Sequence, residues 1–300
     1  MRLLVAFSLA LVLPMPGLAQ QPPKLDVPAD VIADTDVEYA NHGEPLKLDL
    51  VRPKDAKGPL PVIICIHGGG FRAGNRYGYR PLCIKLAQHG YAAATISYRL
   101  APKYQFPAAI FDCKAAVRFL KWNAEKYGLD QARVGVTGSS AGGHLAQFLG
   151  VTANVAEFDP GIPPSTGGIR AVPTTGVRCV VNVYGPSDFT KSYGKSVDAA
   201  EVLPLFLGGN LETVRRRHIV ASPLYWVTPD AAPTLCIHGT EDKYVAHEQA
   251  VWLIEKLKAA DVEAELLTLP GAGHGFKGED ATRAEAALIA FFEKQLKNKK

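Results

Sequence analysis

Short apolar segments with the character of strands alternate with amphipathic, helix-like segments along most of this chain. Residues 62–66 form a continuous apolar run, as expected for a strand covered on both faces. In residues 107–124 the apolar side chains recur at helical spacing, and Gly128 follows as a typical helix stop. Chains that alternate strands and helices in this way form a mostly parallel sheet with helices on both faces. We therefore predict an α/β fold.

The same alternation covers the rest of the chain, with two exceptions. Further strands are expected at 46–51, 91–98, 133–137, 177–183, 234–237 and 263–269, and further helices at 79–88, 141–149, 247–259 and 281–296. The segment 46–51 alternates apolar and polar residues, as an edge or antiparallel strand does. Residues 154–176 predict a long loop, and residues 185–233 mix short helical pieces with prolines. This second excursion is expected to form a cap or one wall of a substrate pocket, and the alternative is surface decoration.

The first 19 residues have the pattern of a secretory signal peptide. Arg2 precedes an apolar run from Leu3 to Leu13, and small residues end at Ala19, where a signal peptidase would cut. The run is shorter than a transmembrane helix, which needs about 20 apolar residues. Cleavage after Ala19 predicts a secreted or periplasmic protein in which residues 20–300 form one domain, since no repeat or linker divides them. An N-terminal membrane anchor that stays uncleaved is the alternative.

Composition and cysteine spacing exclude several classes of protein. The 33 basic and 29 acidic residues are dispersed along the chain, whereas a nucleic-acid binder concentrates positive charge on one face. Five cysteines cannot all pair, and their spacing matches neither a zinc site nor a disulfide framework. We expect most of them to be buried apolar residues, with a Cys83–Cys113 bridge left open. The sequence contains no motif that binds a metal ion or a nucleotide cofactor, so no cofactor of either kind is expected. It makes no prediction of the oligomeric state.

The segment from Gly138 to Gly142 has the pattern Gly-x-Ser-x-Gly and lies between a strand and a helix. That is the context of a nucleophile elbow, in which a sharp turn lifts the serine hydroxyl above the sheet. Glycines are needed on both sides because a side chain there would collide with neighbouring backbone. The sequence therefore predicts Ser140 as a nucleophile, while Ser139 occupies the variable position.

A glycine-rich loop follows the buried strand 62–66. It runs His67-Gly68-Gly69-Gly70-Phe71, and consecutive glycines let backbone N–H groups approach a ligand closely. The loop matches one half of an oxyanion hole, and the N–H after the nucleophile supplies the other half. We expect Gly69, Gly70 and Ala141 to provide the donors, and His67 to be structural.

A serine nucleophile needs a base, and the base needs an orienting acid. His274 lies on a glycine-rich loop after the last strand, and Asp242 follows the preceding strand, so both are expected at the carboxyl edge of the sheet. The order Ser140, Asp242, His274 is that of α/β-hydrolases. Glu241 is the competing acid, and His144, inside the helix after the elbow, is expected to pack.

Together these motifs resemble the bifunctional feruloyl/acetylxylan esterase-like and hormone-sensitive-lipase-like α/β-hydrolases over roughly residues 35–295. The resemblance rests on His67-Gly68-Gly69-Gly70-Phe71, Tyr98-Arg99-Leu100-Ala101-Pro102, Phe106-Pro107-Ala108-Ala109, Asp112, Gly138-Ser139-Ser140-Ala141-Gly142-Gly143-His144, Ala221-Ser222-Pro223, His238-Gly239-Thr240, Asp242 and Gly273-His274-Gly275-Phe276. Ser139 stands where the lipase-like members commonly carry Asp, which favours the first group. The resemblance implies an α/β-hydrolase fold with an eight-stranded, mostly parallel sheet.

The resemblance also implies a secreted serine carboxylesterase acting on small acyl esters, with acetyl or feruloyl groups on plant polysaccharide favoured. Four aromatic residues flank the motif loops and are candidates for the substrate pocket, with ordinary packing as the alternative: Phe71, Tyr184, Phe189 and Phe276. Another acyl hydrolase on the same triad (lipase-like, amidase or peptidase) is the second hypothesis. A catalytically silent binding module is the third, although such modules usually lack a triad residue.

Overall fold

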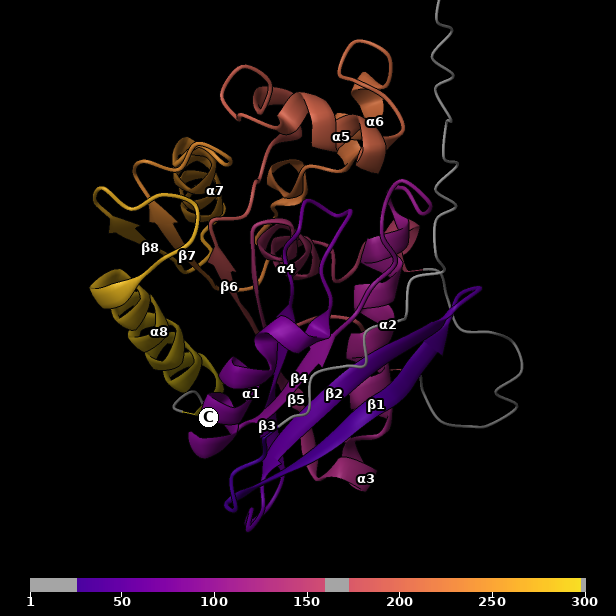
Figure 1. The fold of residues 1–300 in the computed structure, drawn as a ribbon, viewed down its shortest axis with the longest axis vertical. Coiled ribbons are helices and arrows are strands. Elements are labelled where there is room, and N and C mark those ends of the chain that lie inside the picture. Colours follow the sequence, from indigo (N-terminus) through magenta and orange to yellow (C-terminus); the bar gives the residue numbers. More distant parts are fainter. Residues whose placement is uncertain (1–25, 160–172, 298–300) are drawn as a thin grey trace, which may run out of the picture.

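A computed structural model describes residues 26–159 and 173–297 and contains one eight-stranded sheet with the strand order β1-β2-β4-β3-β5-β6-β7-β8 (Figure 1). The strands are β1 (Val31–Asn41), β2 (Pro45–Pro53), β3 (Leu60–Ile66), β4 (Ala92–Ile96), β5 (Leu129–Ser139), β6 (Cys179–Val183), β7 (Thr234–Gly239) and β8 (Ala264–Leu269). Strands β3 to β8 are mutually parallel, and β1 and β2 are antiparallel. The predicted α/β-hydrolase class is confirmed. The signal-peptide prediction lies outside the described residues.

Strand β1 corrects the sequence prediction, which begins the sheet at residue 46. It pairs with β2 along its length, but the register shifts between Asp34 and Val37 and again between Glu38 and Ala40. Each shift interrupts the two-residue alternation of buried and exposed side chains that identifies a strand. The prediction that 46–51 is antiparallel is confirmed by β2, which lies antiparallel to both β1 and β4.

Helices cover both faces of the sheet. They are α1 (Arg80–Gln88), α2 (Ala108–Trp122), α3 (Ala124–Tyr127), α4 (Ala141–Val151), α5 (Ala199–Leu207), α6 (Arg215–Val220), α7 (Glu248–Ala259) and α8 (Gly278–Phe292). Helices α1 and α8 pack on one face, and α2, α4 and α7 pack on the other. The predicted stop at Gly128 is confirmed, since this residue caps α3 with a φ of 66°.

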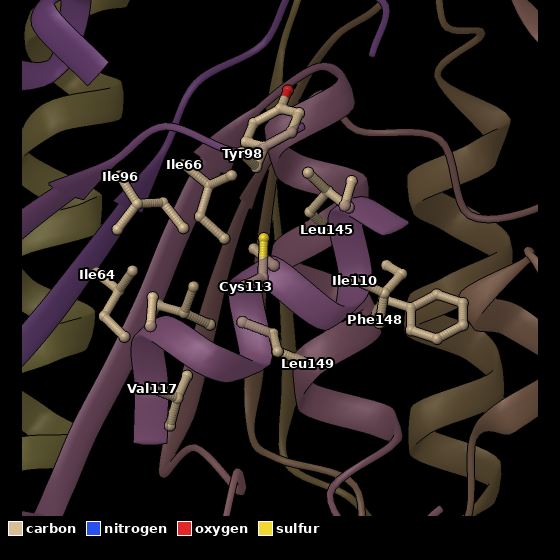
Figure 2. Packing of buried hydrophobic residues seen from close by; sticks show 14 of the residues in the cluster. Ile64, Ile66, Ile96, Tyr98, Ile110, Cys113, Val117, Leu145, Phe148 and Leu149 are labelled. Atoms are coloured by element: carbon tan, nitrogen blue, oxygen red, sulfur yellow. The ribbon is translucent and has the colours of Figure 1, made fainter. Parts of the chain in front are cut away.

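Strand β3 shows why its apolar run has no alternation. Ile64 and Ile66 project into the core under α2 and α4, whereas Ile63 and Cys65 project into the core under α1 and α8. Figure 2 shows the first of these cores, where the strand isoleucines meet side chains of α2 and α4 such as Val117. Burial on both faces fixes the central strands and therefore the positions of the loops at their ends.

All five cysteines are buried, and none of them forms a disulfide. Cys83 lies in the core under α1 and α8, and Cys113 lies in the core under α2 and α4. Since the sheet separates these two side chains, the Cys83–Cys113 bridge that the sequence left open does not form. The expectation that the cysteines act as buried apolar residues is confirmed.

The two predicted excursions differ in what the structure describes. Most of the loop 154–176 lies outside the described residues. The segment 185–233, here named the cap segment, contains α5 and α6 and stands above the carboxyl edge of the sheet (Figure 1). Among the described residues, no helix combines the length and apolar character that crossing a membrane requires.

Candidate active site

The turn between β5 and α4 holds Ser140 in a backbone conformation that few residues adopt. Its φ is 55° and its ψ is −122°. A Cβ atom on Gly142 would lie 2.0 Å from the carbonyl oxygen of Ile66, and one on Gly138 would lie 2.3 Å from that of Gly142. The turn can therefore form only with glycine at both positions, as the sequence predicts. It has the geometry of a nucleophile elbow.

Three side chains from three separate strand ends meet above this turn. The Ser140 Oγ lies 3.0 Å from His274 Nε2, and His274 Nδ1 lies 2.7 Å from Asp242 Oδ2. Ser140 follows β5, Asp242 follows β7 and His274 follows β8. Since a carboxylate only accepts, Nδ1–H donates to Asp242 and leaves Nε2 to accept the serine proton. This arrangement can turn a serine hydroxyl into a nucleophile.

Asp242 is buried but fully hydrogen-bonded. Its Oδ1 accepts the backbone N–H groups of Tyr244 and Val245, each at 2.9 Å, and its Oδ2 faces His274. A second imidazole, that of His238 on β7, places its Nε2 3.3 Å from the same oxygen. Burial raises the pKa of Asp242, but the hydrogen bonds from both histidines and from Val245 outweigh it and hold the pKa well below its usual range. Asp242 is therefore an ionised partner for His274.

The competing acid and the two other histidines considered in the sequence analysis take no part in the contact among Ser140, His274 and Asp242. Glu241 is exposed, and among the described residues its carboxylate accepts no hydrogen bond from His274, whose Nδ1 faces Asp242 instead. His144 is fully buried in α4, where burial lowers its pKa to about 4 and its Nε2 lies 2.7 Å from the carbonyl oxygen of Ala221. His67 is also buried and stacks on Tyr98. Both therefore make packing contacts.

The predicted oxyanion-hole residues line the same space as Ser140. Gly69, Gly70 and Ala141 all border one cavity with the serine. Among the described residues, the N–H groups of Gly69 and Gly70 meet no hydrogen-bond acceptor. Ala141 is the first residue of α4, so its N–H has no partner within the helix. Free donors beside a nucleophile are what a developing oxyanion needs.

The cavity has a volume of about 460 Å³, within the usual range for small-molecule sites. Its apolar wall consists of Phe71, Phe189 and the α5 residues Ala199, Val202 and Leu203. Another part of the lining contains His274 and residues 244–246 from the loop after Asp242. The cap segment thus builds one wall of the cavity. Among the described residues, no group of three His, Cys, Asp or Glu side chains could hold a metal ion.

The four aromatic candidates have different positions. Phe71 and Phe189 are almost fully buried and belong to the apolar wall of the cavity. Tyr184 borders the cavity as well, with its ring centroid 4.6 Å from that of His274. Phe276 does not line the cavity; its ring packs edge-on against Tyr184 at 5.0 Å. The structure therefore brings three of the four to the site.

Sequence reasoning missed the cavity residues that no motif marks. Tyr244 lies two residues after Asp242, and its ring is 49% exposed. Val202 and Leu203 come from α5, where the sequence shows only a mixed helical piece. An aromatic residue so close to the predicted acid was the one available indication, and it singles out Tyr244 alone.

Comparison with known proteins places these features in a family. Residues 48–257 match the BD-FAE family, and residues 219–297 match the dienelactone hydrolase family. Among curated proteins, the esterase LipC of Mycobacterium tuberculosis is 36% identical over 261 residues, which cover 83% of this chain and 62% of LipC. This chain likewise spans only about three fifths of two further mycobacterial esterases.

Two solved structures resemble the whole fold. A truncated carbohydrate esterase from gut microbiota shares 30% of its sequence with a TM-score of 0.74, covering 88% of this chain and 96% of that one. An acetyl ester-xyloside bifunctional hydrolase from Caldicellulosiruptor lactoaceticus has 26% sequence identity and a TM-score of 0.71. The match covers 84% of this chain and 89% of that one. These proteins have the same scaffold over nearly all of their length.

Proposed function

Since the chain belongs to the BD-FAE family of α/β-hydrolases, we propose that it is a secreted serine carboxylesterase acting on small acyl esters of plant polysaccharide. The observation that carries this proposal is the continuous contact from Ser140 through His274 to Asp242. The names of its relatives support the esterase reaction. The two structural neighbours, one a carbohydrate esterase and one an acetyl ester-xyloside hydrolase, support a carbohydrate ester.

The first half of the reaction forms an acyl-enzyme. Ser140 Oγ attacks the ester carbonyl carbon while its proton passes to His274 Nε2. Asp242, ionised and held by two backbone N–H groups, stabilises the resulting imidazolium. The negative charge that develops on the carbonyl oxygen is stabilised by the N–H groups of Gly69, Gly70 and Ala141.

The second half regenerates the enzyme. The imidazolium returns its proton to the leaving alcohol as the C–O bond breaks, and the alcohol departs. His274 then takes a proton from water, which attacks the acyl group on Ser140. The second tetrahedral intermediate collapses as the imidazolium returns its proton to Ser140 Oγ, which releases the carboxylic acid and regenerates the free serine. Every step uses the same three side chains and the same donors.

The test is a comparison of wild type with Ser140→Ala on esters, anilides and acetylated xylan. We expect wild type to hydrolyse p-nitrophenyl acetate and to release acetate from acetylated xylan. The variant should lose about 10⁴-fold or more in kcat, as removal of a triad nucleophile does. A fluorophosphonate should label wild type and leave the variant unlabelled.

Other results would contradict the proposal in distinct ways. Equal activity of Ser140→Ala would exclude the acyl-enzyme on this residue. Faster cleavage of anilides or formamides than of esters would favour an amidase or peptidase. Absence of labelling and of turnover on every ester would favour a silent binding module.

The proposed export of the protein rests on the predicted signal peptide alone. We infer that residues 1–19 direct export, because their charge and apolar pattern match a signal peptide. N-terminal sequencing of protein recovered from the periplasm or culture medium should begin at Gln20. Recovery of the full-length chain from the membrane fraction would instead indicate an uncleaved anchor.

A further inference from the structure

The chemistry of ester cleavage assigns the two halves of the substrate to different walls of the cavity. The leaving alcohol must lie against His274 Nε2, because that nitrogen returns the proton. The carbonyl oxygen points at the donors of Gly69, Gly70 and Ala141. The acyl group takes the remaining direction, toward the wall built by Phe71 and α5. The alcohol therefore meets the wall that carries His274 and residues 244–246.

These two walls differ in chemistry and in exposure. On the acyl side, Phe71 and Phe189 are almost fully buried, and Phe71 stacks on Phe206 with centroids 3.9 Å apart. On the alcohol side, Tyr244 is 49% exposed. A closed apolar wall suits a small acyl group, whereas an open wall admits a bulky alcohol that continues into solvent.

Tyr244 has a fixed backbone and an accessible ring. Its N–H donates to Asp242 Oδ1 at 2.9 Å, so its position is locked to the loop that carries the acid. Its ring centroid lies 5.2 Å from that of His274. Among the described residues, its hydroxyl has no hydrogen-bond partner. The ring is thus a flat apolar surface beside the imidazole that protonates the leaving group.

Polar side chains also line this cavity. Lys195, Ser196 and Asp198 all border it, from the start of the cap segment. The backbone N–H of Val197, between them, donates to the carbonyl of Lys243 at 2.9 Å, which ties this segment to the loop of Tyr244. An aromatic face with nearby charged and hydroxyl groups matches a sugar ring, whose faces are apolar and whose edges carry hydroxyls.

We propose that Tyr244 is the stacking platform for the sugar ring whose hydroxyl is esterified, and therefore a specificity-determining residue for the alcohol half of the substrate. The proposal rests on the proposed esterase function and deepens it. An ester with a small alkyl alcohol reaches Ser140 without covering this ring, so Tyr244 distinguishes between esters that carry the same acyl group.

The experiment compares two acetate esters, ethyl acetate and a mono-O-acetylated methyl β-xyloside. For each enzyme the ratio of kcat/KM for the xyloside to kcat/KM for ethyl acetate is measured. In Tyr244→Ala this ratio should fall about tenfold, the effect of losing one aromatic contact. Tyr244→Phe, which keeps the ring, should restore the ratio to within about threefold of wild type.

A matched control is Tyr225→Ala, because Tyr225 has the same 49% exposure but lies outside the cavity lining. Its ratio should equal that of wild type. The proposal is overturned if Tyr244→Ala leaves the ratio unchanged, or if it lowers both activities equally, which would indicate that the ring positions the His274 imidazole. If wild type hydrolyses neither ester, the proposed function itself is wrong and this inference falls with it.

Discussion

The elbow and the cap segment border the same cavity but are held in place by different means. At the elbow, backbone contacts leave no room for a side chain at Gly138 or Gly142. In the cap segment, side-chain contacts set the wall, such as the stacking of Phe206 on Phe71 with ring centroids 3.9 Å apart. The first arrangement excludes a side chain at these two positions, whereas the second depends on which side chains are present. We therefore expect the chemistry to depend on the part that backbone geometry fixes, and selectivity for the acyl group to depend on the side chains of the cap segment.

The largest effect is expected where the backbone contact is tightest. In Gly142→Ala the new Cβ would lie 2.0 Å from the Ile66 carbonyl and 2.6 Å from that of His67. The elbow and the glycine loop must then separate, which displaces the oxyanion donors. We expect a loss of about 3 kcal/mol or more in stability and of about 100-fold in kcat, measured by urea unfolding and p-nitrophenyl acetate turnover.

Gly78→Ala is the control, because a Cβ there meets nothing within 4 Å. Its stability should stay within about 0.5 kcal/mol of wild type. If Gly142→Ala behaves like Gly78→Ala, the elbow is not held by close backbone contact, and the contrast with the cap segment disappears.

An intermediate effect is expected where the two regions join. His144, on the elbow helix, contacts the cap segment through the Ala221 carbonyl at 2.7 Å and the Phe189 ring at 4.7 Å. Burial lowers its pKa to about 4, below the value of about 6.5 in an unfolded chain. The folded state therefore holds it neutral, and this contribution is complete above pH 6.5 and is lost as pH falls toward 4.

The measurement is urea unfolding of wild type and His144→Gln at pH 7.5 and 4.5. Other groups titrate in both proteins, so their effects cancel in the difference. The advantage of wild type should shrink by about 2 to 3 kcal/mol between the two pH values. If the difference in unfolding free energy between wild type and His144→Gln were the same at both pH values, the neutral imidazole would not stabilise the contact between the cap segment and the elbow helix.

The smallest effect is expected from the cap segment alone. Val202→Ala removes two methyl groups from the wall assigned to the acyl chain. Each extra methylene in an apolar pocket changes selectivity by about tenfold or more. Because the variant leaves more space for a longer acyl chain, the ratio of kcat/KM for p-nitrophenyl butyrate to kcat/KM for p-nitrophenyl acetate should rise by about tenfold. Val220→Ala, on α6 and outside the cavity lining, should leave this ratio unchanged. An unchanged ratio in Val202→Ala would place the acyl chain on another wall.

Sequence reasoning succeeded where a residue's position follows from a strand end. Ser140, Asp242 and His274 each come shortly after a buried parallel strand, and such ends share one edge of a sheet. The apolar runs of those strands are visible in the sequence. The contact among the three residues could therefore be expected from their order along the chain, although their catalytic roles remain predictions.

It failed where tertiary contacts decide. Strand β1 is an edge strand with two register shifts, so its alternation is broken before it can be recognised. Phe276 and Tyr244 are both aromatic residues close to a predicted triad residue. Only the paths of their loops put Phe276 behind Tyr184 and Tyr244 beside the cavity. No spacing rule distinguishes the two.

Strand β8, which leads to His274, has one neighbouring strand, β7, in the part of the chain that the structure describes. The serine, in contrast, follows β5, which is paired on both sides. Segments with fewer buried contacts and more exposed backbone hydrogen bonds open at a lower free energy than the core. We therefore expect ester turnover to be lost at a lower denaturant concentration than the structure of the central strands, because His274 depends on the outer edge of the sheet.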